Sequence, residues 1–102
     1  MKINAMYSVP DDAEAFEAHY LSTHAPLVDT LPGILRQEIA RSAGTLDGSP
    51  APFYRVTDLY FEDLAAAQAA LGSPAGRATA QDAQELAART GCTLTLTLCE
   101  LD

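Results

Sequence analysis

The residue of this chain best suited to proton transfer is His24, which stands in the segment Tyr20-Leu21-Ser22-Thr23-His24-Ala25-Pro26-Leu27. Imidazole is the side chain that gains or loses a proton near neutral pH, so a histidine at the mouth of an apolar pocket can act as a general acid or base. The alternative role is structural, because a histidine ring can also cap a helix end through free backbone carbonyls. Both roles stay open at the level of sequence.

Three aromatic residues are the candidates for binding a ligand beside His24. Tyr20 precedes His24 by four residues and Phe16 precedes Tyr20 by four. One helix would therefore place Phe16, Tyr20 and His24 on the same side. Tyr7 shares the inner face of the first predicted strand, so it points toward that helix. The hypothesis is that Tyr7, Phe16 and Tyr20 line a cavity between helices and sheet, with the ring of His24 facing it. The alternative is that their rings only fill the core.

The sequence favours neither a metal nor a cofactor. His19 lies five residues before His24, which separates the two rings by about 140° on a regular helix, so they would not face one ion. No cysteine or paired carboxylate joins them at ligand spacing. The chain has no phosphate-binding glycine loop, no GxSxG elbow and no CxxC pair. We therefore expect no bound metal and no cofactor.

Composition excludes several classes of partner. The 102 residues include 14 acidic and 6 basic side chains, giving a formal net charge of -8. Phosphate contacts and anionic membrane surfaces both require a basic face, so neither nucleic acid nor membrane is an expected partner. The N-terminus shows no secretory signal, and Cys92 and Cys99 lie too far apart along one predicted strand to form a disulfide. A reducing cytoplasm is the expected compartment.

The elements that must position these residues follow from hydrophobic periodicity and from capping and turn residues. A helix is expected from Asp11 or Asp12 to about Ser22 or Thr23, breaking around His24 because Pro26 disfavours helical backbone at the residue before it. A second helical region should begin at Glu62, pause at 72–76 and end before Gly91. The predicted strands cover 2–9, 34–42, 53–61 and 92–101, and a long hairpin loop covers 43–52.

The order β-α-β-β-α-β predicts a single α+β domain over residues 1–102, with a ferredoxin-like antiparallel sheet that carries both helices on one face. The other face of the sheet would then need its own cover. We expect it to be apolar, with Met6, Phe53, Leu59 and Phe61 among threonines. An apolar face of that size does not normally stay exposed, so the sequence predicts a homodimer packed sheet against sheet.

The segment from Tyr20 through His24-Ala25-Pro26-Leu27, followed by Leu31-Pro32-Gly33, resembles the EthD family, named after a gene cluster for ethyl tert-butyl ether degradation. The resemblance extends over nearly the whole chain, with Phe16 one helical turn earlier, Ser73-Pro74-Ala75-Gly76 opening the late helix and Asp82 within it. Where related chains have an acidic residue, this one has Ala75, so any role of that acid is absent. The resemblance implies a dimeric α+β barrel.

Relatives in that superfamily include cofactor-free monooxygenases, isomerases, cyclases and decarboxylases, so the resemblance implies a small-molecule pocket but no particular reaction. One hypothesis is an enzyme that binds and converts a small hydrophobic or aromatic metabolite without a cofactor, with His24 as general acid or base. The other is a non-catalytic protein that binds a metabolite or meets another protein. Sequence alone does not decide between them.

Overall fold

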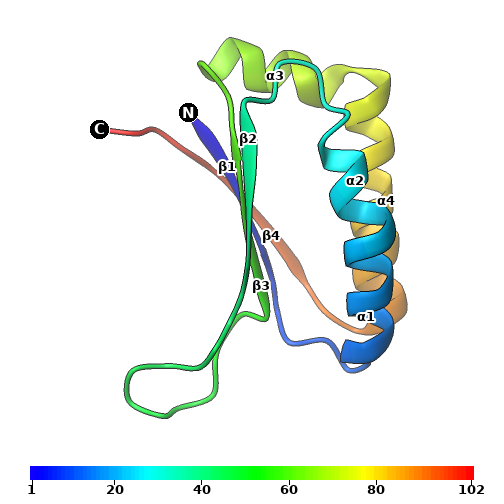
Figure 1. The fold of residues 1–102 in the computed structure, drawn as a ribbon, viewed down its shortest axis with the longest axis vertical. Coiled ribbons are helices and arrows are strands. Elements are labelled where there is room, and N and C mark those ends of the chain that lie inside the picture. The colour runs from blue at the N-terminus through cyan, green and yellow to red at the C-terminus, as the bar shows by residue number, and fades with distance from the viewer.

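The computed structural model describes residues 1–102 as a sheet covered on one side by helices (Figure 1). The predicted α+β order β-α-β-β-α-β is confirmed. The elements, in chain order, are β1 (Lys2–Tyr7), α1 (Ala13–His19), a π-helical turn η1 (Tyr20–His24), α2 (Ala25–Val28), β2 (Arg36–Arg41), β3 (Arg55–Tyr60), α3 (Leu64–Gly72), α4 (Pro74–Thr90) and β4 (Leu94–Cys99).

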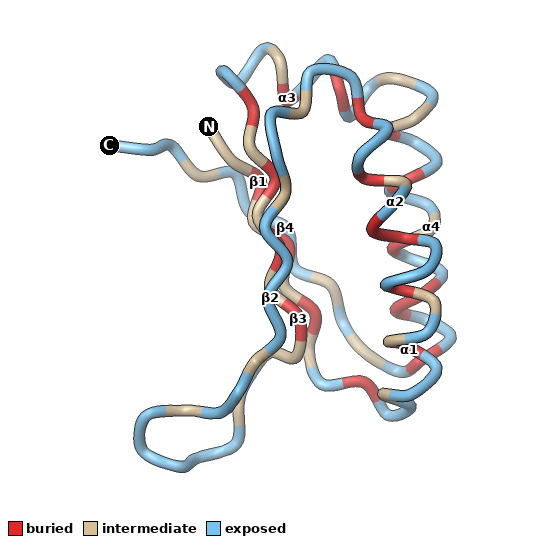
Figure 2. The backbone as a smooth tube through the Cα atoms, viewed as in Figure 1, coloured by how far each residue is buried: buried red, intermediate tan, exposed pale blue.

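The four strands form one antiparallel sheet in the order β2-β3-β1-β4. The central strand β1 alternates strictly, with Ile3, Ala5 and Tyr7 buried and their neighbours half-buried. Ile3, Ala5 and Tyr7 are paired with Leu98, Leu96 and Leu94 of β4. Paired residues lie on the same face of a sheet, so these three leucines also face the helices. In Figure 2 the buried segments of the strands and helices face one another across the space between the two layers.

The predicted composition of the outer sheet face is wrong at two residues. Leu59 and Phe61 belong to the buried core against the helices, where Leu59 is paired with Ile3. Their parity places them on the inner face, since Arg55 and Thr57 on the same strand are buried too. The outer face instead carries half-buried polar groups. There Asp58 accepts a hydrogen bond of 2.8 Å from Asn4, and Lys2 lies 3.4 Å away.

The expected break of the first helix at His24 is also wrong. The backbone stays helical from Ala13 to Val28, and the turn Tyr20–His24 is a π-helix in which the N–H of Ala25 bonds the carbonyl of Tyr20, five residues back. Proline in a helix lacks an N–H, and its ring collides with the carbonyl four residues earlier. Widening the turn ahead of Pro26 relieves that collision, so the helix continues instead of ending.

The long helix α4 begins at Pro74, within the pause expected at 72–76, and ends before Gly91 as expected. The Ser73 side chain accepts a hydrogen bond from the N–H of Gly76, Pro74 occupies the first turn, and Gly91 ends the helix in the left-handed conformation at φ 75°. At its start α4 lies so close to the end of α3 that a Cβ on Gly76 would overlap the backbone of Ala70 and Leu71. This close approach fixes where α4 runs across the sheet.

Cys92 and Cys99 are both free thiols, as their spacing predicted. None of the helices is long and apolar enough to cross a membrane.

Candidate functional site

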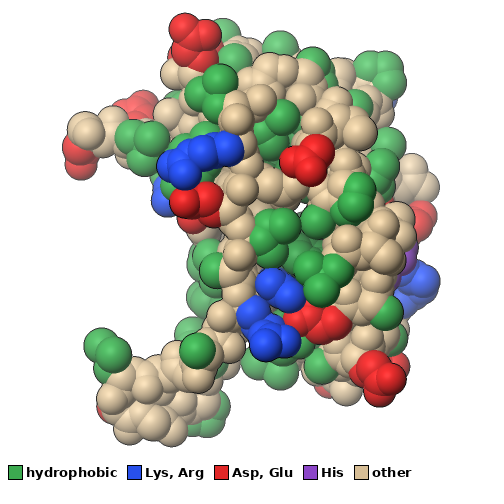
Figure 3. Space-filling model, viewed as in Figure 1, with side chains coloured by type: hydrophobic (Ala, Val, Ile, Leu, Met, Phe, Trp, Pro, Cys, Tyr) green, Lys and Arg blue, Asp and Glu red, His purple; other side chains and the backbone are tan.

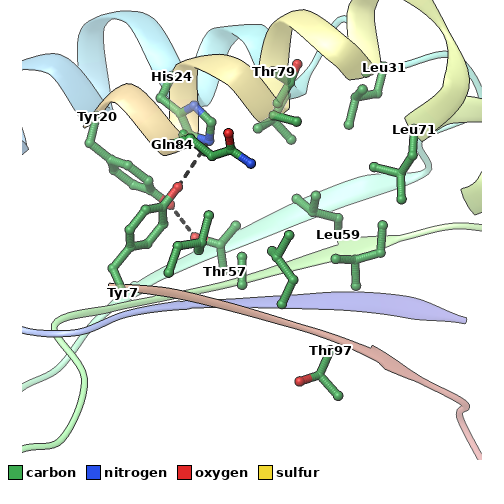
Figure 4. A pocket seen from close by; sticks show the side chains of 18 of the residues that line it. Tyr7, Tyr20, His24, Leu31, Thr57, Leu59, Leu71, Thr79, Gln84 and Thr97 are labelled. Carbon is green, nitrogen blue, oxygen red and sulfur yellow. Dashed lines mark hydrogen bonds between the residues drawn. The ribbon is translucent and has the colours of Figure 1, made fainter. Parts of the chain in front are cut away.

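A cavity of about 380 Å³ lies between the inner face of the sheet and the helices, and it is open on one side. Its wall is mostly hydrophobic, and none of the residues that form it is charged. Figure 4 shows the apolar side chains of Leu31, Leu59 and Leu71 toward one end, and Figure 3 shows hydrophobic side chains gathered in the hollow between the layers. A volume of this order suits a small organic molecule.

The polar side chains of Tyr7, Tyr20, His24 and Thr57 gather at one end of the cavity, whereas Thr79 and Thr97 lie apart from them (Figure 4). The hydroxyl of Tyr7 lies 3.4 Å from Nε2 of His24, and the hydroxyl of Tyr20 is hydrogen-bonded to that of Thr57 (Figure 4). His24 is only 6% exposed. The cavity therefore concentrates its hydrogen-bonding side chains at one end. The rest of its wall is mostly apolar, and the hydroxyl of Thr79 there donates to the carbonyl of Ala75 at 2.7 Å.

The π turn lets the helix carry a continuous column of rings. Phe16 stacks on Tyr20 with centroids 5.4 Å apart, and Tyr20 stacks on His24 with centroids 5.7 Å apart. In a regular α-helix, residues four positions apart are rotated by about 40° from one another around the helix axis. Three rings at that spacing would therefore not stay on one face of the helix. The extra residue in the wide turn offsets that rotation. The column turns the His24 ring toward Tyr7.

Asp82 on α4 fixes the tautomer of His24. Its Oδ2 lies 2.9 Å from Nδ1 of His24, and its Oδ1 lies 2.8 Å from Nε2 of His19. An ionised carboxylate only accepts hydrogen bonds, so the neutral His24 ring must carry its proton on Nδ1. Its Nε2 is then an unprotonated acceptor facing the Tyr7 hydroxyl, which donates to it. The arrangement presents a base to the cavity.

Burial sets the protonation states of these groups. It lowers the pKa of His24 below its ordinary value, against the opposing effect of Asp82. Burial alone would raise the pKa of Asp82, but the hydrogen bonds from the two histidines outweigh it and lower that pKa. Burial raises the pKa of Tyr7 and of Tyr20, which therefore stay neutral phenols. At neutral pH the site holds a neutral base, a hydroxyl donor and an anion behind the base.

An ion pair beside the site supports the ring column. Arg55 is 8% exposed and binds both carboxylate oxygens of Glu17, at 2.8 and 2.9 Å, while its guanidinium lies 5.2 Å from the centre of the Tyr20 ring. Glu17 also accepts from the hydroxyl of Tyr54 at 2.9 Å. This cation is fully paired and does not line the cavity. It therefore packs the back of Tyr20 without adding a charge to the site.

The expected position of His24 is confirmed, since its ring faces a cavity beside Tyr7 and Tyr20. Phe16 differs from expectation: it is fully buried behind the tyrosines and is not part of the cavity wall. Asp82 was not among the predicted site residues, because it lies 58 positions from His24 and only the packing of α4 joins them. The only sequence signal for Asp82 was that it lies in the part of the late helix that resembles the EthD family.

His19 also has a more definite place than its sequence context indicates. The five-residue spacing predicted rings on different sides of the helix, yet both rings contact one carboxylate through the wide turn and α4. No cluster of three or more histidine, cysteine, aspartate or glutamate side chains is arranged to hold a metal ion.

Known proteins place the chain in a family. Residues 11–90 match the model of the EthD domain. An uncharacterized 11.0 kDa protein of Rhodococcus erythropolis, from the thcB-thcC intergenic region, is 38% identical over 86 residues, 84% of this chain and 82% of that protein. The crystal structure of an EthD family protein from Bacillus halodurans superposes with a TM-score of 0.85 at 32% identity, covering 97% of both chains.

A more distant similarity concerns the fold alone. SnoaB from Streptomyces nogalater, a cofactor-independent oxygenase, has a TM-score of 0.63 at 17% identity, over 99% of this chain and 93% of that one. The α+β fold is thus shared with EthD proteins and with this oxygenase. With the domain match and the Bacillus structure covering most of its length, the chain belongs to the EthD family.

Proposed function

We propose that this protein binds a small, uncharged and largely apolar molecule through one weakly acidic hydroxyl or enolisable group, and that His24 removes a proton from it. The observation that carries the proposal is the pairing of an acceptor, Nε2 of His24, with a donor, the hydroxyl of Tyr7, at the polar end of an otherwise apolar cavity. A ligand hydroxyl can donate to the first and accept from the second.

The charge of the ligand is restricted by what the cavity lacks. None of its lining residues is cationic, and the nearest buried cation, Arg55, is committed to Glu17. A carboxylate or phosphate inside such a cavity would lose its hydration without a partner, which is costly. The net charge of -8 disfavours anions further. An uncharged ligand fits these conditions.

The chemistry assigned to the site is a single balanced proton transfer. Nε2 of His24 takes the proton, the resulting imidazolium is held by Asp82 through Nδ1, and the oxyanion left on the ligand accepts from the Tyr7 hydroxyl. Burial makes His24 a weak base. The group it deprotonates must therefore itself be acidic, at about the level of a phenol, whose pKa is about 10, rather than an alcohol.

Binding without chemistry is the second candidate, and the open side of the cavity favours it. Leu96 and Leu98 of β4 line the cavity yet remain 60% and 52% exposed. A site that admits water protects a reactive anion poorly. In this case Tyr7 and His24 would hold the ligand hydroxyl, and the ligand would leave unchanged.

Matched probes test the proposal. We expect 2-naphthol to bind the wild type more tightly than 2-methoxynaphthalene, which cannot donate, and 2-naphthoate, which is charged, to bind weakest, as measured by calorimetry. His24→Phe should keep the fold and abolish the preference for naphthol over its ether, while Tyr7→Phe should reduce it. Equal binding of naphthol and naphthoate would contradict the proposal. Exchange of the C1 hydrogen of bound 2-naphthol for deuterium in D₂O proceeds through the naphtholate, which takes up deuterium at C1 and then loses the original proton. Faster exchange in the wild type than in His24→Phe separates the catalytic from the binding-only candidate.

A further inference from the structure

The second histidine of this site shares its carboxylate with the first. His19 contacts one oxygen of Asp82 and His24 contacts the other, at 2.8 and 2.9 Å. The side chain of His19 is 24% exposed, against 8% for His24, so the first ring is open to solvent and the second lies in the cavity wall. One carboxylate thus joins a ring at the surface to the base inside.

The proton positions along this chain follow from the donors at its two ends. The guanidinium of Arg89 lies 3.2 Å from Nδ1 of His19 and can only donate, so the neutral ring of His19 carries its proton on Nε2 and donates it to Asp82. His24 donates to the other oxygen, as argued above. The carboxylate therefore accepts from two neutral rings.

These contacts make the two protonation events competitive. Either ring, once it becomes an imidazolium, uses the negative charge of Asp82 and repels a second positive charge a few ångströms away. The groups facing His24 are Tyr7 from β1, Tyr20 from its own helix, and Asp82 from α4; those facing His19 are Asp82 and Arg89, both from α4. Asp82 is the one anion between the rings.

We propose that His19 is a positioning residue that sets the base strength of His24 through Asp82. A proton taken up at Nδ1 of His19, with the exposed guanidinium of Arg89 turning away into solvent, makes His24 a weaker base in the cavity. The two rings then titrate as a coupled pair rather than independently. The coupling itself needs no ligand. Its consequence for turnover rests on the proposed role of His24 as the base.

Two substitutions at His19 separate its charge from its hydrogen bond. His19→Gln keeps an N–H donor for Asp82 but never becomes charged, whereas His19→Lys is charged throughout the range. NMR titration of the His24 ring, with EDTA present to remove adventitious metal, measures the effect without any substrate. We expect His19→Gln to raise the proton affinity of His24 about three- to tenfold. His19→Lys should leave it at the wild-type value or lower it.

The wild type supplies a test that does not depend on the variants. Its His24 resonances should report two protonation steps rather than one, because each ring senses the charge on the other. Independent single-step titrations of the two rings, or the same His24 titration in His19→Gln and His19→Lys, would overturn the proposal. If His24 proves to be the catalytic base, the acid limb of the kcat/KM profile should move to higher pH in His19→Gln. The shift in pH should match the change in the proton affinity of His24. Coupled rings without any turnover would leave the inference standing and remove only the catalytic role.

Discussion

At the scale of single residues, the site depends on a histidine whose two ring nitrogens have different tasks. Nδ1 of His24 is tied to Asp82, and Nε2 faces Tyr7 and the cavity. A leucine or phenylalanine would fill this place without requiring a partner, whereas a buried imidazole is stable only because both nitrogens are paired. The pairing makes the tautomer a property of the fold.

Asp82→Asn should make His24 a weaker base. The carboxylate is the group that opposes the effect of burial on the pKa of His24, so the amide should let that pKa fall further. NMR titration of the ring measures this, and any turnover that depends on the base should fall with it. A His24 pKa that stays constant or rises in the variant would show that Asp82 is not what supports the imidazolium.

The same ring makes the stability of the fold depend on pH. Burial lowers the pKa of folded His24 below its ordinary 6.5, so between these values the unfolded chain binds a proton that the folded chain does not. The free energy of unfolding should therefore fall as the pH drops below 6.5 and through the folded pKa. Urea unfolding at about pH 7.5 and 5.5 measures this, and His24→Gln should lose less stability between the two. If both proteins lose the same stability between the two pH values, the pH dependence of the unfolding free energy comes from groups other than His24.

At the scale of elements, the sequence predicted the order of strands and helices well because their signals are local. The alternation of Ile3, Ala5 and Tyr7, the helix start at Asp12 and the stop at Gly91 each act within a few residues. The course of the chain through Pro26 could not be predicted in this way. A proline predicts a break from local sterics, but here the helix relieves the clash by widening by one residue. The stacked rings of Phe16, Tyr20 and His24 pack across the widened turn, which is a tertiary contribution.

The junction of α3 and α4 gives a direct test of how closely these elements must pack. Gly76→Ala should destabilise the protein by about 1 to 3 kcal/mol, because the new methyl group would overlap backbone atoms of Ala70 and Leu71 that cannot move away easily. Gly72→Ala is the matched control, since a Cβ there meets nothing within 4 Å. Urea unfolding of the two variants measures the difference. Equal stability would mean that the junction is looser than described.

At the scale of the whole molecule, the prediction of a homodimer now needs a different reason from the one the sequence suggested. The outer sheet face holds Lys2, Asn4 and Asp58, which water can solvate. Leu59 and Phe61, two of the residues expected to make that face apolar, lie in the core instead. Among the exposed hydrophobic side chains, Leu96 and Leu98 also line the cavity and form an apolar rim at its open side. We propose that a second copy of the chain covers this rim.

Sedimentation equilibrium at micromolar concentration tests the assembly. We expect a species of twice the chain mass of 10.8 kDa. Leu98→Glu should shift it toward the monomer, because a charge would replace part of the apolar rim, whereas Leu46→Glu, on the exposed hairpin loop, serves as the control and should not. A wild-type monomer at all concentrations would remove the second copy from the account.

The proposed function requires that a ligand hydroxyl bind between His24 and Tyr7 at the polar end of the cavity. A crystal structure of the wild-type protein with bound 2-naphthol would show whether it does. We expect the naphthol oxygen at hydrogen-bond distance from both Nε2 of His24 and the Tyr7 hydroxyl, with the rings lying along the leucines of the wall. Naphthol bound elsewhere, or bound with its oxygen turned away from His24, would contradict the proposed site.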